Sequence, residues 1–353
     1  MKRYNNLFNS ITSFENLCLA LRKAQSGKKN KDIVSKFIYI QEIELLKLQN
    51  EILQKRYNPG KYTTFYIYDK KKRLISAAPF RDRIVHHALC NVIEPIFEKS
   101  FIHDTYANRT GKGTHKAIKR CAEYSRVNKY VLKFDIKKYF ASIDHEILKT
   151  IICSKIKDKD TLWIINLIID NSNKQEEISD YFFDDHLFTP IERKKGLPIG
   201  NQTSQLFANI YLDPLDHYIK EKLRCQFYIR YVDDCLLFAD NKEELWKIGE
   251  KIIHELEFFR LKIHPTKYHI IPVQCGIPFL GYRIFSEYYF LDKNNIHRFK
   301  RRMRFFQNAY ANKEIDLVTI KQSIHGWLGH ALPANTYNLR KKLFSQFSFK
   351  SCG

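Results

Sequence analysis

Three carboxylates stand at the ends of expected strands and could bind divalent cations together. Asp233 and Asp234 lie between two β-prone apolar runs within residues 227–240, which predicts a hairpin with an acidic tip. Aspartate tolerates the positive φ of a tight turn, so this turn has a reason to be acidic without any chemistry. However, adjacent like charges at the end of an apolar hairpin are costly, and a divalent cation would remove that cost.

The third carboxylate follows from the alternation in residues 130–136. Val131, Lys133 and Asp135 share one face of this expected strand, and the other face carries Tyr130, Leu132, Phe134 and Ile136. If the second face packs on helices, Asp135 lies at the end of a strand on the open face of the sheet. Carboxylates from separate strands, here Asp135 and Asp233, suit a two-metal phosphoryl-transfer site, because hard Mg²⁺ ions take oxygen ligands.

Three ordered motifs resemble those of reverse transcriptases. Residues 231–234, Tyr-Val-Asp-Asp, resemble the catalytic signature, and Phe134-Asp135 followed by Tyr139-Phe140 resembles the first palm motif. Residues 196–205 resemble the nucleotide-binding motif, and the whole resemblance extends from about Lys71 to about Arg283. It implies an α+β fold of the right-hand polymerase type, with fingers, a palm of antiparallel sheet plus helices, and a helical thumb.

The resemblance also implies a division of the chain and a reaction. Residues 1–127 would form an N-terminal segment and the fingers, 128–285 the palm with a fingers-proximal insertion at about 150–195, and 286–353 the thumb. The implied reaction is the attack of a primer 3′-hydroxyl on the α-phosphate of a dNTP, templated by RNA. Two Mg²⁺ ions, with Mn²⁺ as a substitute, would be held by a metal site that comprises Asp135, Ile136, Asp233 and Asp234; Asp135, Asp233 and Asp234 are the catalytic residues, the last in a supporting role.

Six residues are expected to bind the incoming dNTP. Arg73, beside the basic turn 69–72, would hold the triphosphate, unless this turn is only a solvated tip. Phe140 matches the position of a steric gate against the ribose 2′-hydroxyl, with a plain core residue as the alternative. Lys267 would orient the leaving pyrophosphate or is a surface lysine. The remaining three belong to the 196–205 motif, where glycine admits close backbone approach and a helix start suits phosphate: Ile199, Gly200 and Gln205.

Nucleic-acid contacts are expected at three places. Arg109 lies in a stretch that resembles the second fingers motif, and residues 279–285 resemble a primer grip that includes Phe279, Gly281 and Tyr282. The C-terminal module is basic and helical, with Lys300, Arg301 and Arg304 among its cations. Such a run is either a solvated face or, in the place of a thumb, a surface along the backbone of a template–primer duplex, which is A-like in an RNA–DNA hybrid.

Within the family, the chain most resembles the enzymes of diversity-generating retroelements. At two positions of the 196–205 motif, most reverse transcriptases carry Gln and Pro. This chain instead has Ile199 and Gln205 at these positions, as the diversity-generating enzymes do. An isoleucine cannot donate a hydrogen bond, so the nascent base pair would be checked less tightly. The resemblance implies errors opposite template adenines, a structured template RNA and a small basic accessory protein oligomer. A retron-type or phage-defence reverse transcriptase, and a non-catalytic RNA-binding protein on a polymerase fold, are the alternatives.

Composition limits the remaining choices. The 353 residues are 44% hydrophobic and 28% charged, and 60 Lys+Arg against 38 Asp+Glu give a formal charge of +22, which favours a nucleic-acid partner. Eight cysteines lack metal-ligand spacing, so neither a zinc ribbon nor a disulfide framework is indicated. The N-terminus lacks an apolar signal region and no apolar run is long enough to span a bilayer, so we expect no membrane partner. We expect a bacterial or phage-encoded protein that is located in the cytoplasm.

Three further expectations concern local structure. The apolar spacing within residues 37–52 predicts one long amphipathic helix that stops before Asn58-Pro59-Gly60. Arg81 and Arg83 open another helix and either assist in phosphate binding or pair with Asp82 and Glu94. The acidic stretch 171–195 offers rival metal ligands on paper, Glu176, Glu177, Asp180, Asp184 and Asp185, but without a strand to fix them we expect a solvated loop.

Overall fold

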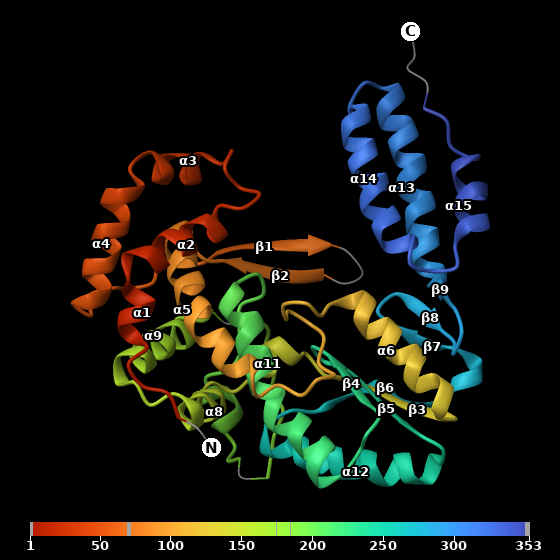
Figure 1. Ribbon diagram of the computed structural model, residues 1–353, viewed down its shortest axis with the longest axis horizontal. Helices are drawn as coiled ribbons and strands as arrows, with labels where there is room; N and C mark the ends of the chain where they lie inside the picture. The colour runs from red at the N-terminus through yellow and green to blue at the C-terminus, as the bar shows by residue number, and fades with distance from the viewer. Residues whose placement is uncertain (1–2, 69–71, 174, 184, 350–353) are drawn as a thin grey trace.

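The computed structural model describes residues 3–68, 72–173, 175–183 and 185–349, and a four-stranded antiparallel sheet lies in the lower right part of Figure 1. Its strand order is β4-β5-β3-β6, with β4 at Tyr228–Tyr231, β5 at Asp234–Ala239, β3 at Tyr130–Ile136 and β6 at Ile263–Pro272. The hairpin and the strand expected around the three carboxylates are therefore confirmed. In the register of β3 and β5, Asp135 lies directly opposite Asp234.

The two faces of this sheet contribute to two different cores. Leu132, Phe134 and Ile136 are buried in a large core that includes residues of helices α11 (Gln202–His217) and α12 (Lys242–Phe258), as the alternation predicted. The opposite face was expected to be open, and this was wrong for most of its length. Val131 is fully buried there in a second core with residues of α6 (Thr114–Val127), so this face is polar only toward the end that carries Asp135 and Asp234.

Two N-terminal helices, α1 (Phe8–Thr12) and α2 (Phe14–Ala24), pack on α5 (Phe80–Glu98). Helix α4 (Gln41–Leu53) packs on α1 and α2, and α3 (Asp32–Tyr39) packs on α4. The single helix expected across 37–52 was wrong, because the backbone leaves helical geometry at Ile40 (φ −119°, ψ 32°). Val34 of α3 is buried, whereas Tyr39 and Ile43 beside the break are 91% and 66% exposed. Apolar spacing alone did not locate this change of direction.

The hairpin of β1 (Thr63–Tyr68) and β2 (Lys72–Ala77) projects across the middle of the molecule toward the C-terminal helices (Figure 1). Between β3 and β4 the chain forms α7 (Tyr139–Ser142), α8 (His145–Lys155), α9 (Lys159–Asp170), α10 (Thr189–Glu192) and α11, which continues into a π-helical turn at Tyr218–Lys222. The carboxylate of Asp144 accepts hydrogen bonds from the backbone N–H groups of Glu146 and Ile147 and so caps the N-terminus of α8.

The C-terminal part begins with a three-stranded sheet of β7 (Ile277–Phe279), β8 (Tyr282–Ile284) and β9 (Tyr289–Leu291). Three helices follow and stand together at one side of Figure 1: α13 (Lys293–Ala311), α14 (Leu317–Ala331) and α15 (Tyr337–Phe344). Phe299 of α13 stacks on Trp327 of α14 with ring centroids 3.9 Å apart. In the described part of the chain, every helix is too short or too polar to span a bilayer.

The acidic stretch 171–195 is held to the protein more firmly than the expected solvated loop. Asp185 forms an ion pair with Arg193, and both side chains are almost fully buried, at 2% and 5% exposure. Asp180 accepts a hydrogen bond from Lys137 at 2.9 Å, and Glu176 pairs with Lys138. Basic partners, Lys137 outside the stretch and Arg193 within it, explain why the solvated loop was wrong for Asp180 and Asp185, whereas the Glu176 side chain is 52% exposed. Asp184 lies outside the described residues.

Candidate active site

In the turn between β4 and β5, the residue with strained backbone geometry is Val232. Tyr231 pairs with Asp234, so Val232 and Asp233 form a two-residue turn, and Val232 has a φ of +58°. We expected an aspartate to take the positive φ, and this was wrong. A β-branched residue in the left-handed region is a true outlier. Two hydrogen bonds hold this turn: Arg230 Nη1 donates to the Val232 carbonyl at 3.1 Å, and the Ile136 N–H donates to the Asp233 carbonyl at 3.3 Å.

The three carboxylates gather at this end of the sheet. Asp135 is only 9% exposed and faces Asp234 across the β3–β5 pair. Burial, together with the nearby charge of Asp135, raises the pKa of Asp233 to about 6, and burial also raises the pKa of Asp234. Crowded carboxylates with raised pKa values require positive charge nearby if they are to be ionised at neutral pH.

Two lysines supply positive charge to this cluster. Lys267 of β6 donates a hydrogen bond to Asp135 Oδ2 at 2.5 Å, and Lys133 of β3 lies 3.5 Å from Asp234 Oδ1. Among the described residues, no group of three or more His, Cys, Asp or Glu is arranged so that it could hold a metal ion as the side chains now stand. The metal site therefore stays a prediction, although an all-oxygen donor set in a crowded acidic site is the chemistry that hard divalent cations prefer. Ile136 has a fully buried side chain, so only its backbone could take part.

The loop before α11 joins two of the expected nucleotide-binding positions. Leu197 N–H donates to the Phe140 carbonyl at 2.8 Å, and Ser76 N–H of β2 donates to the Ile199 carbonyl at 3.0 Å. Gly200 has a φ of +117°, and a Cβ there would lie 3.2 Å from Ile75, so this position favours glycine. The fold therefore brings Phe140, the 196–201 loop and strand β2 together, as a nucleotide site requires.

The remaining expected nucleotide contacts lie around this loop with different exposure. Arg73 is exposed on β2, and Gln205 is half-buried in the first turns of α11. Phe140 is half-buried and makes an edge contact with Tyr139, with ring centroids 5.7 Å apart, so both the gate and the core alternatives remain. Lys72 lies over the ring of Tyr66 at 4.1 Å. Residues 69–71 of the basic turn are outside the described residues.

Three expected nucleic-acid contacts are corrected. The Arg109 side chain is only 6% exposed and is occupied by Glu98 at 2.7 Å and by the Ile102 carbonyl at 2.7 Å, so its guanidinium does not face a phosphate. Phe279 and Tyr282 are each 1% exposed, and Tyr282 donates its hydroxyl to the His330 carbonyl at 2.6 Å. These two rings hold the small sheet on α14. Gly281, at φ +85°, lies between them in the turn and is the part of this hairpin that is free of a bulky side chain.

The expected basic surface of the C-terminal helices is in place. On α13, Arg301 and Arg304 are exposed and Lys300 is half-exposed. Arg81, by contrast, pairs with Glu51, and Arg83 donates to the Ala78 carbonyl at 2.8 Å, so both are used within the N-terminal half of the chain. This differs from either alternative that we considered for them.

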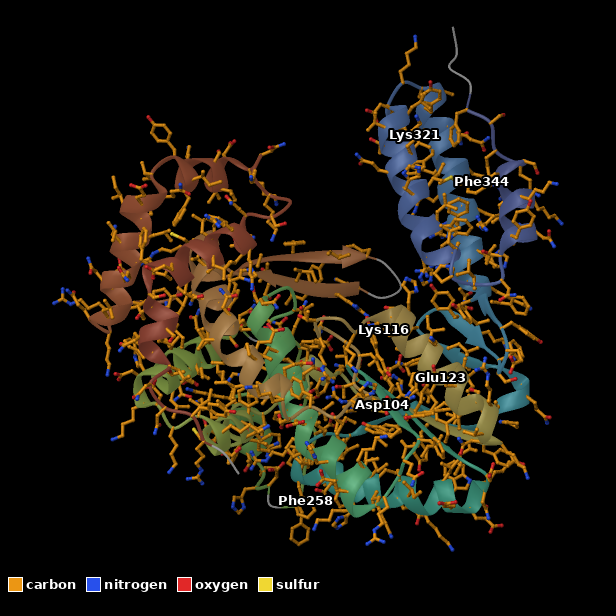
Figure 2. All side chains as sticks on the ribbon, in the orientation of Figure 1. Asp104, Lys116, Glu123, Phe258, Lys321 and Phe344 are labelled. Atoms are coloured by element: carbon orange, nitrogen blue, oxygen red, sulfur yellow. The ribbon has the colours of Figure 1, made fainter. Side chains whose placement is uncertain are left out.

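The sequence reasoning missed a buried charge directly beneath the turn at Val232 and Asp233. Arg230 and Asp216 of α11 are 1% and 0% exposed and form an ion pair at 2.6 Å. The β4 backbone at Arg230 is paired on its other side with the segment that contains Asp104, which is also buried and lies near the middle of Figure 2. Although burial opposes it, hydrogen bonds from groups that include Tyr124 lower the pKa of Asp104 to about 2. The signal was an arginine at an apolar position of a buried strand, which demands an acidic partner.

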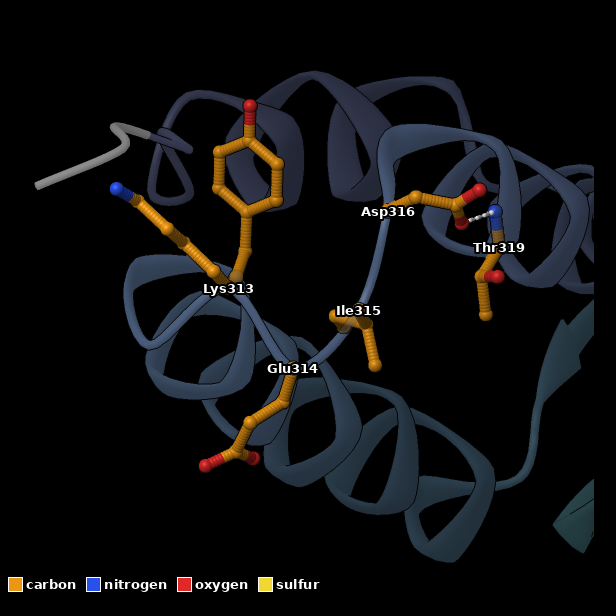
Figure 3. A pocket seen from close by; sticks show the side chains of 6 residues that line it. Lys313, Glu314, Ile315, Asp316 and Thr319 are labelled. Atoms are coloured by element: carbon orange, nitrogen blue, oxygen red, sulfur yellow. Dashed lines mark hydrogen bonds between the residues drawn. The ribbon is translucent and has the colours of Figure 1, made fainter.

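A hollow of about 530 Å³ lies elsewhere, at the turn between α13 and α14 (Figure 3). Its lining includes Tyr310 and Lys313, together with Asp316, whose carboxylate accepts a hydrogen bond from the backbone N–H of Thr319 at 2.8 Å. That bond caps the N-terminus of α14. The hollow is therefore the concave side of a helix connection and is separate from the carboxylate cluster.

Comparisons with known proteins agree with this geometry. Residues 60–284 match the family described as "Reverse transcriptase (RNA-dependent DNA polymerase)", which is more than half of the chain and includes all three carboxylates. Protein YkfC of Escherichia coli (strain K12) is 25% identical over 284 residues, which cover 69% of this chain and 71% of YkfC. The group II intron-encoded protein LtrA of Lactococcus lactis subsp. cremoris is 26% identical over 181 residues, 50% of this chain and 28% of LtrA. Nuclear intron maturase 2, mitochondrial, of Arabidopsis thaliana is 30% identical over 135 residues, 33% of this chain and 18% of that protein.

Proposed function

The chain belongs to the reverse transcriptase family and is an RNA-directed DNA polymerase, and from this premise we propose that it copies a template-repeat RNA into cDNA with adenine-directed errors, as an enzyme of a diversity-generating retroelement. The observation that carries the catalytic part is the register of β3 and β5, which sets Asp135 opposite Asp234 with Asp233 in the adjoining turn. The observation that carries the mutagenic part is Ile199, which offers the nascent base pair no hydrogen-bond donor.

In this proposal Asp135, Asp233 and Asp234, with the backbone of Ile136, hold two divalent cations, Mg²⁺ or Mn²⁺. The ions would supply charge neutralisation for the primer hydroxyl, the triphosphate and the leaving pyrophosphate. The cations would relieve the burial and the like-charge crowding that raise the pKa of Asp233, and Lys267 holds Asp135 by a hydrogen bond in their absence.

The nucleotide would lie between β2 and the loop before α11. Arg73 on the exposed edge of β2 would pair with the triphosphate, and Lys267 would move from Asp135 to the leaving phosphates. The ring of Phe140, whose carbonyl is bonded to Leu197 of the loop, would exclude a ribose 2′-hydroxyl and so select dNTPs. Gly200 and Gln205 would line the same loop and helix start beside the base pair.

We further propose the right-hand division of the chain, with fingers within 1–127, the palm within 128–285 including the insertion at about 150–195, and the thumb within 286–353. The exposed cations Arg301 and Arg304, with Lys300, would contact the phosphates of an RNA–DNA duplex, whose A-like shape favours backbone contacts over base readout. The Gly281 turn would approach the primer end. Template RNA and a small basic accessory protein oligomer complete the proposed partners.

A second candidate function is favoured by the names of the relatives. LtrA is printed as a group II intron-encoded protein and the Arabidopsis relative as an intron maturase, so this chain could serve an intron-like RNA instead of a variable repeat. Retron-type and phage-defence enzymes share the same chemistry. All of these would make cDNA, but none of them requires errors at template adenines, so the error spectrum separates them from the diversity-generating enzyme.

The test is primer extension on an RNA template with Mg²⁺ and dNTPs, with and without co-expressed accessory protein and cognate RNA, followed by sequencing of the cDNA. Asp233→Ala should abolish synthesis, whereas Asp240→Ala, at an exposed residue just past the far end of β5, should not. Ile199→Gln should reduce errors at adenine, and Ile191→Gln, an isoleucine that is 77% exposed on α10, is its control. Faithful product would leave the polymerase and refute the mutagenic role. Intact RNA binding without any product would favour a non-catalytic RNA-binding protein.

A further inference from the structure

Arg230 lies under the catalytic turn on the side of the sheet away from Asp135 and Asp234. It pairs with Cys235 across the β4–β5 hairpin, and its side chain reaches α11, where it contacts Asp216 and Asn209. Both Arg230 and Asp216 are almost completely buried. A buried arginine is costly unless each of its donors finds an acceptor.

Every nitrogen of this guanidinium is used. Nε donates to both Asp216 oxygens at 2.8 and 3.0 Å, and Nη2 donates to Asp216 Oδ2 at 2.6 Å. Nη1 points the other way and donates to the Val232 carbonyl at 3.1 Å and to Asn209 Oδ1 at 3.2 Å. The planar guanidinium of Arg230 therefore links the Asp216 carboxylate on α11 to the backbone carbonyl of Val232 in the turn.

The Val232 peptide is the part of the turn that most needs such a bond. Its φ of +58° places a β-branched residue in the left-handed region, from which it would relax if the carbonyl were released. The next residue is Asp233, and relaxation at Val232 would redirect its side chain. The Ile136–Asp233 backbone bond, at 3.3 Å, is the other bond that holds the turn against β3.

We propose that Arg230, anchored by Asp216, is a positioning residue that holds the Val232 peptide in its left-handed conformation and so fixes the direction in which Asp233 presents its carboxylate to divalent cations. The inference rests on the proposed function in one respect, namely that Asp233 is a cation ligand. A lysine at 230 would keep the charge beside Asp216, but a single ammonium cannot span from Asp216 to the Val232 carbonyl as the guanidinium does.

A purely structural role for the ion pair makes a different prediction, and the chain provides a matched control. Asp213, three residues before Asp216 on the same helix, forms another buried ion pair with Lys155 at 3.0 Å, with side chains 6% and 7% exposed. Lys155 belongs to α8, also donates to Ser100 and lies over the ring of Phe97, and none of these contacts involves the turn at Val232 and Asp233. If burial of charge is all that matters, breaking either pair should have the same consequences.

The experiment is a double-mutant cycle on the full chain with Arg230→Lys and Val232→Gly, and with Lys155→Met as the control. Glycine adopts positive φ without strain, so it removes the need for the arginine while it leaves the Val232 carbonyl in place. Mn²⁺ binding is measured by electron paramagnetic resonance in the absence of nucleotide, kcat by primer extension, and stability by thermal unfolding. In the valine background, Arg230→Lys should weaken Mn²⁺ binding and lower kcat by roughly tenfold or more, and in the glycine background the loss should shrink to about threefold or less.

Each outcome decides the inference. Coupling in Mn²⁺ binding, together with a Lys155→Met variant that lowers the melting temperature but leaves Mn²⁺ affinity unchanged, supports it. Additive effects of the two substitutions, or a Lys155→Met variant that loses Mn²⁺ affinity as Arg230→Lys does, overturn it. If the wild-type chain binds Mn²⁺ and shows the coupling but makes no DNA, the positioning role stands while the proposed function fails. If it makes DNA and the cycle is additive, only the positioning role fails.

Discussion

Replacing Lys267 by methionine should tighten the binding of divalent cations in the absence of nucleotide and at the same time slow DNA synthesis. Lys267 now donates to Asp135 at 2.5 Å and therefore competes with any cation for that carboxylate. Methionine keeps a similar length and removes the charge. The two effects have opposite signs because the same lysine is proposed to pair with the leaving phosphates once a nucleotide is bound.

The size of the effect follows from the exposure of the pair. A hydrogen bond between two charged groups is worth about 1.5–3 kcal/mol when it is protected from water. The side chain of Lys267 is 37% exposed and that of Asp135 is 12% exposed, so solvent screening reduces the pair to ~1 kcal/mol. Loss of this competitor should therefore strengthen Mn²⁺ binding by about fivefold. The turnover should fall by roughly tenfold or more, as for the removal of a group that acts in the transition state.

The assay pairs Mn²⁺ titration of the free protein with primer extension under single-turnover conditions. Lys262→Met is the matched control, because it removes the same charge from a lysine of similar exposure, 41%, whose acidic neighbour is Asp180 at 3.9 Å. It should leave Mn²⁺ affinity and turnover within about twofold of the wild type, as expected for a screened surface charge. If Lys267→Met instead weakens Mn²⁺ binding, Lys267 does not compete for the carboxylates, and the reasoning fails.

Three further predictions concern stability. Gly249→Ala should lower the free energy of unfolding in urea by ~1–3 kcal/mol, because the new Cβ would collide with the Tyr268 hydroxyl and lie 3.1 Å from Leu132. Gly326→Ala, where a Cβ would meet nothing within 4 Å, should raise that free energy by up to ~1 kcal/mol through helix propensity. Equal effects at the two sites would contradict the packing argument. Burial lowers the pKa of His86 to about 3, below its usual 6.5, so the unfolded chain takes up the proton first and stability falls as the pH drops from 6.5 toward 3, by up to about 1.4 kcal/mol per pH unit. His86→Leu should flatten the profile of the urea midpoint against pH between pH 6.5 and 3. An unchanged slope would contradict the assignment of this pH dependence to His86. Arg193→Met should leave the buried Asp185 uncompensated and cost ~3–5 kcal/mol, with faster proteolysis within 171–195; unchanged proteolysis would mean that this ion pair does not anchor the segment.

The parts of the fold that could be predicted from the sequence are those that local patterns specify. Alternation within 130–136 predicted which side chains of β3 enter the larger core, and the two apolar runs around Asp233 predicted the hairpin. The start of helix α5 at Arg81 and Arg83 was also predicted, because the proline at position 79 marks it. The meeting of Asp135 with Asp234 needed only the assumption that the two strands are neighbours in one sheet.

The errors share a physical cause, which is that the side chain was already bound by a partner that the local sequence pattern did not identify. Arg109 looked like a phosphate ligand because its acidic partner Glu98, on α5, could not be recognised from spacing. Phe279 looked like a primer contact because the helix that covers the small sheet, α14, lies about fifty residues later. Asp185 looked solvated because its partner Arg193 belongs to the same polar stretch. In each case a charged or aromatic side chain that seemed available for a ligand was already used inside the protein.

The catalytic turn shows the reverse situation, in which a residue that seemed merely structural bears on the site. Arg230 occupies an apolar position of a β-prone run, and alternation predicts that its side chain lies on the same face as buried Tyr228. A buried guanidinium must have an anion and several acceptors, so the sequence already required an acidic residue from another element. Only the structure identifies that residue as Asp216 and shows that Arg230 Nη1 donates to the Val232 carbonyl. That carbonyl belongs to the strained peptide directly before Asp233. In our proposal the apolar residue Val232 therefore determines where the Asp233 carboxylate lies.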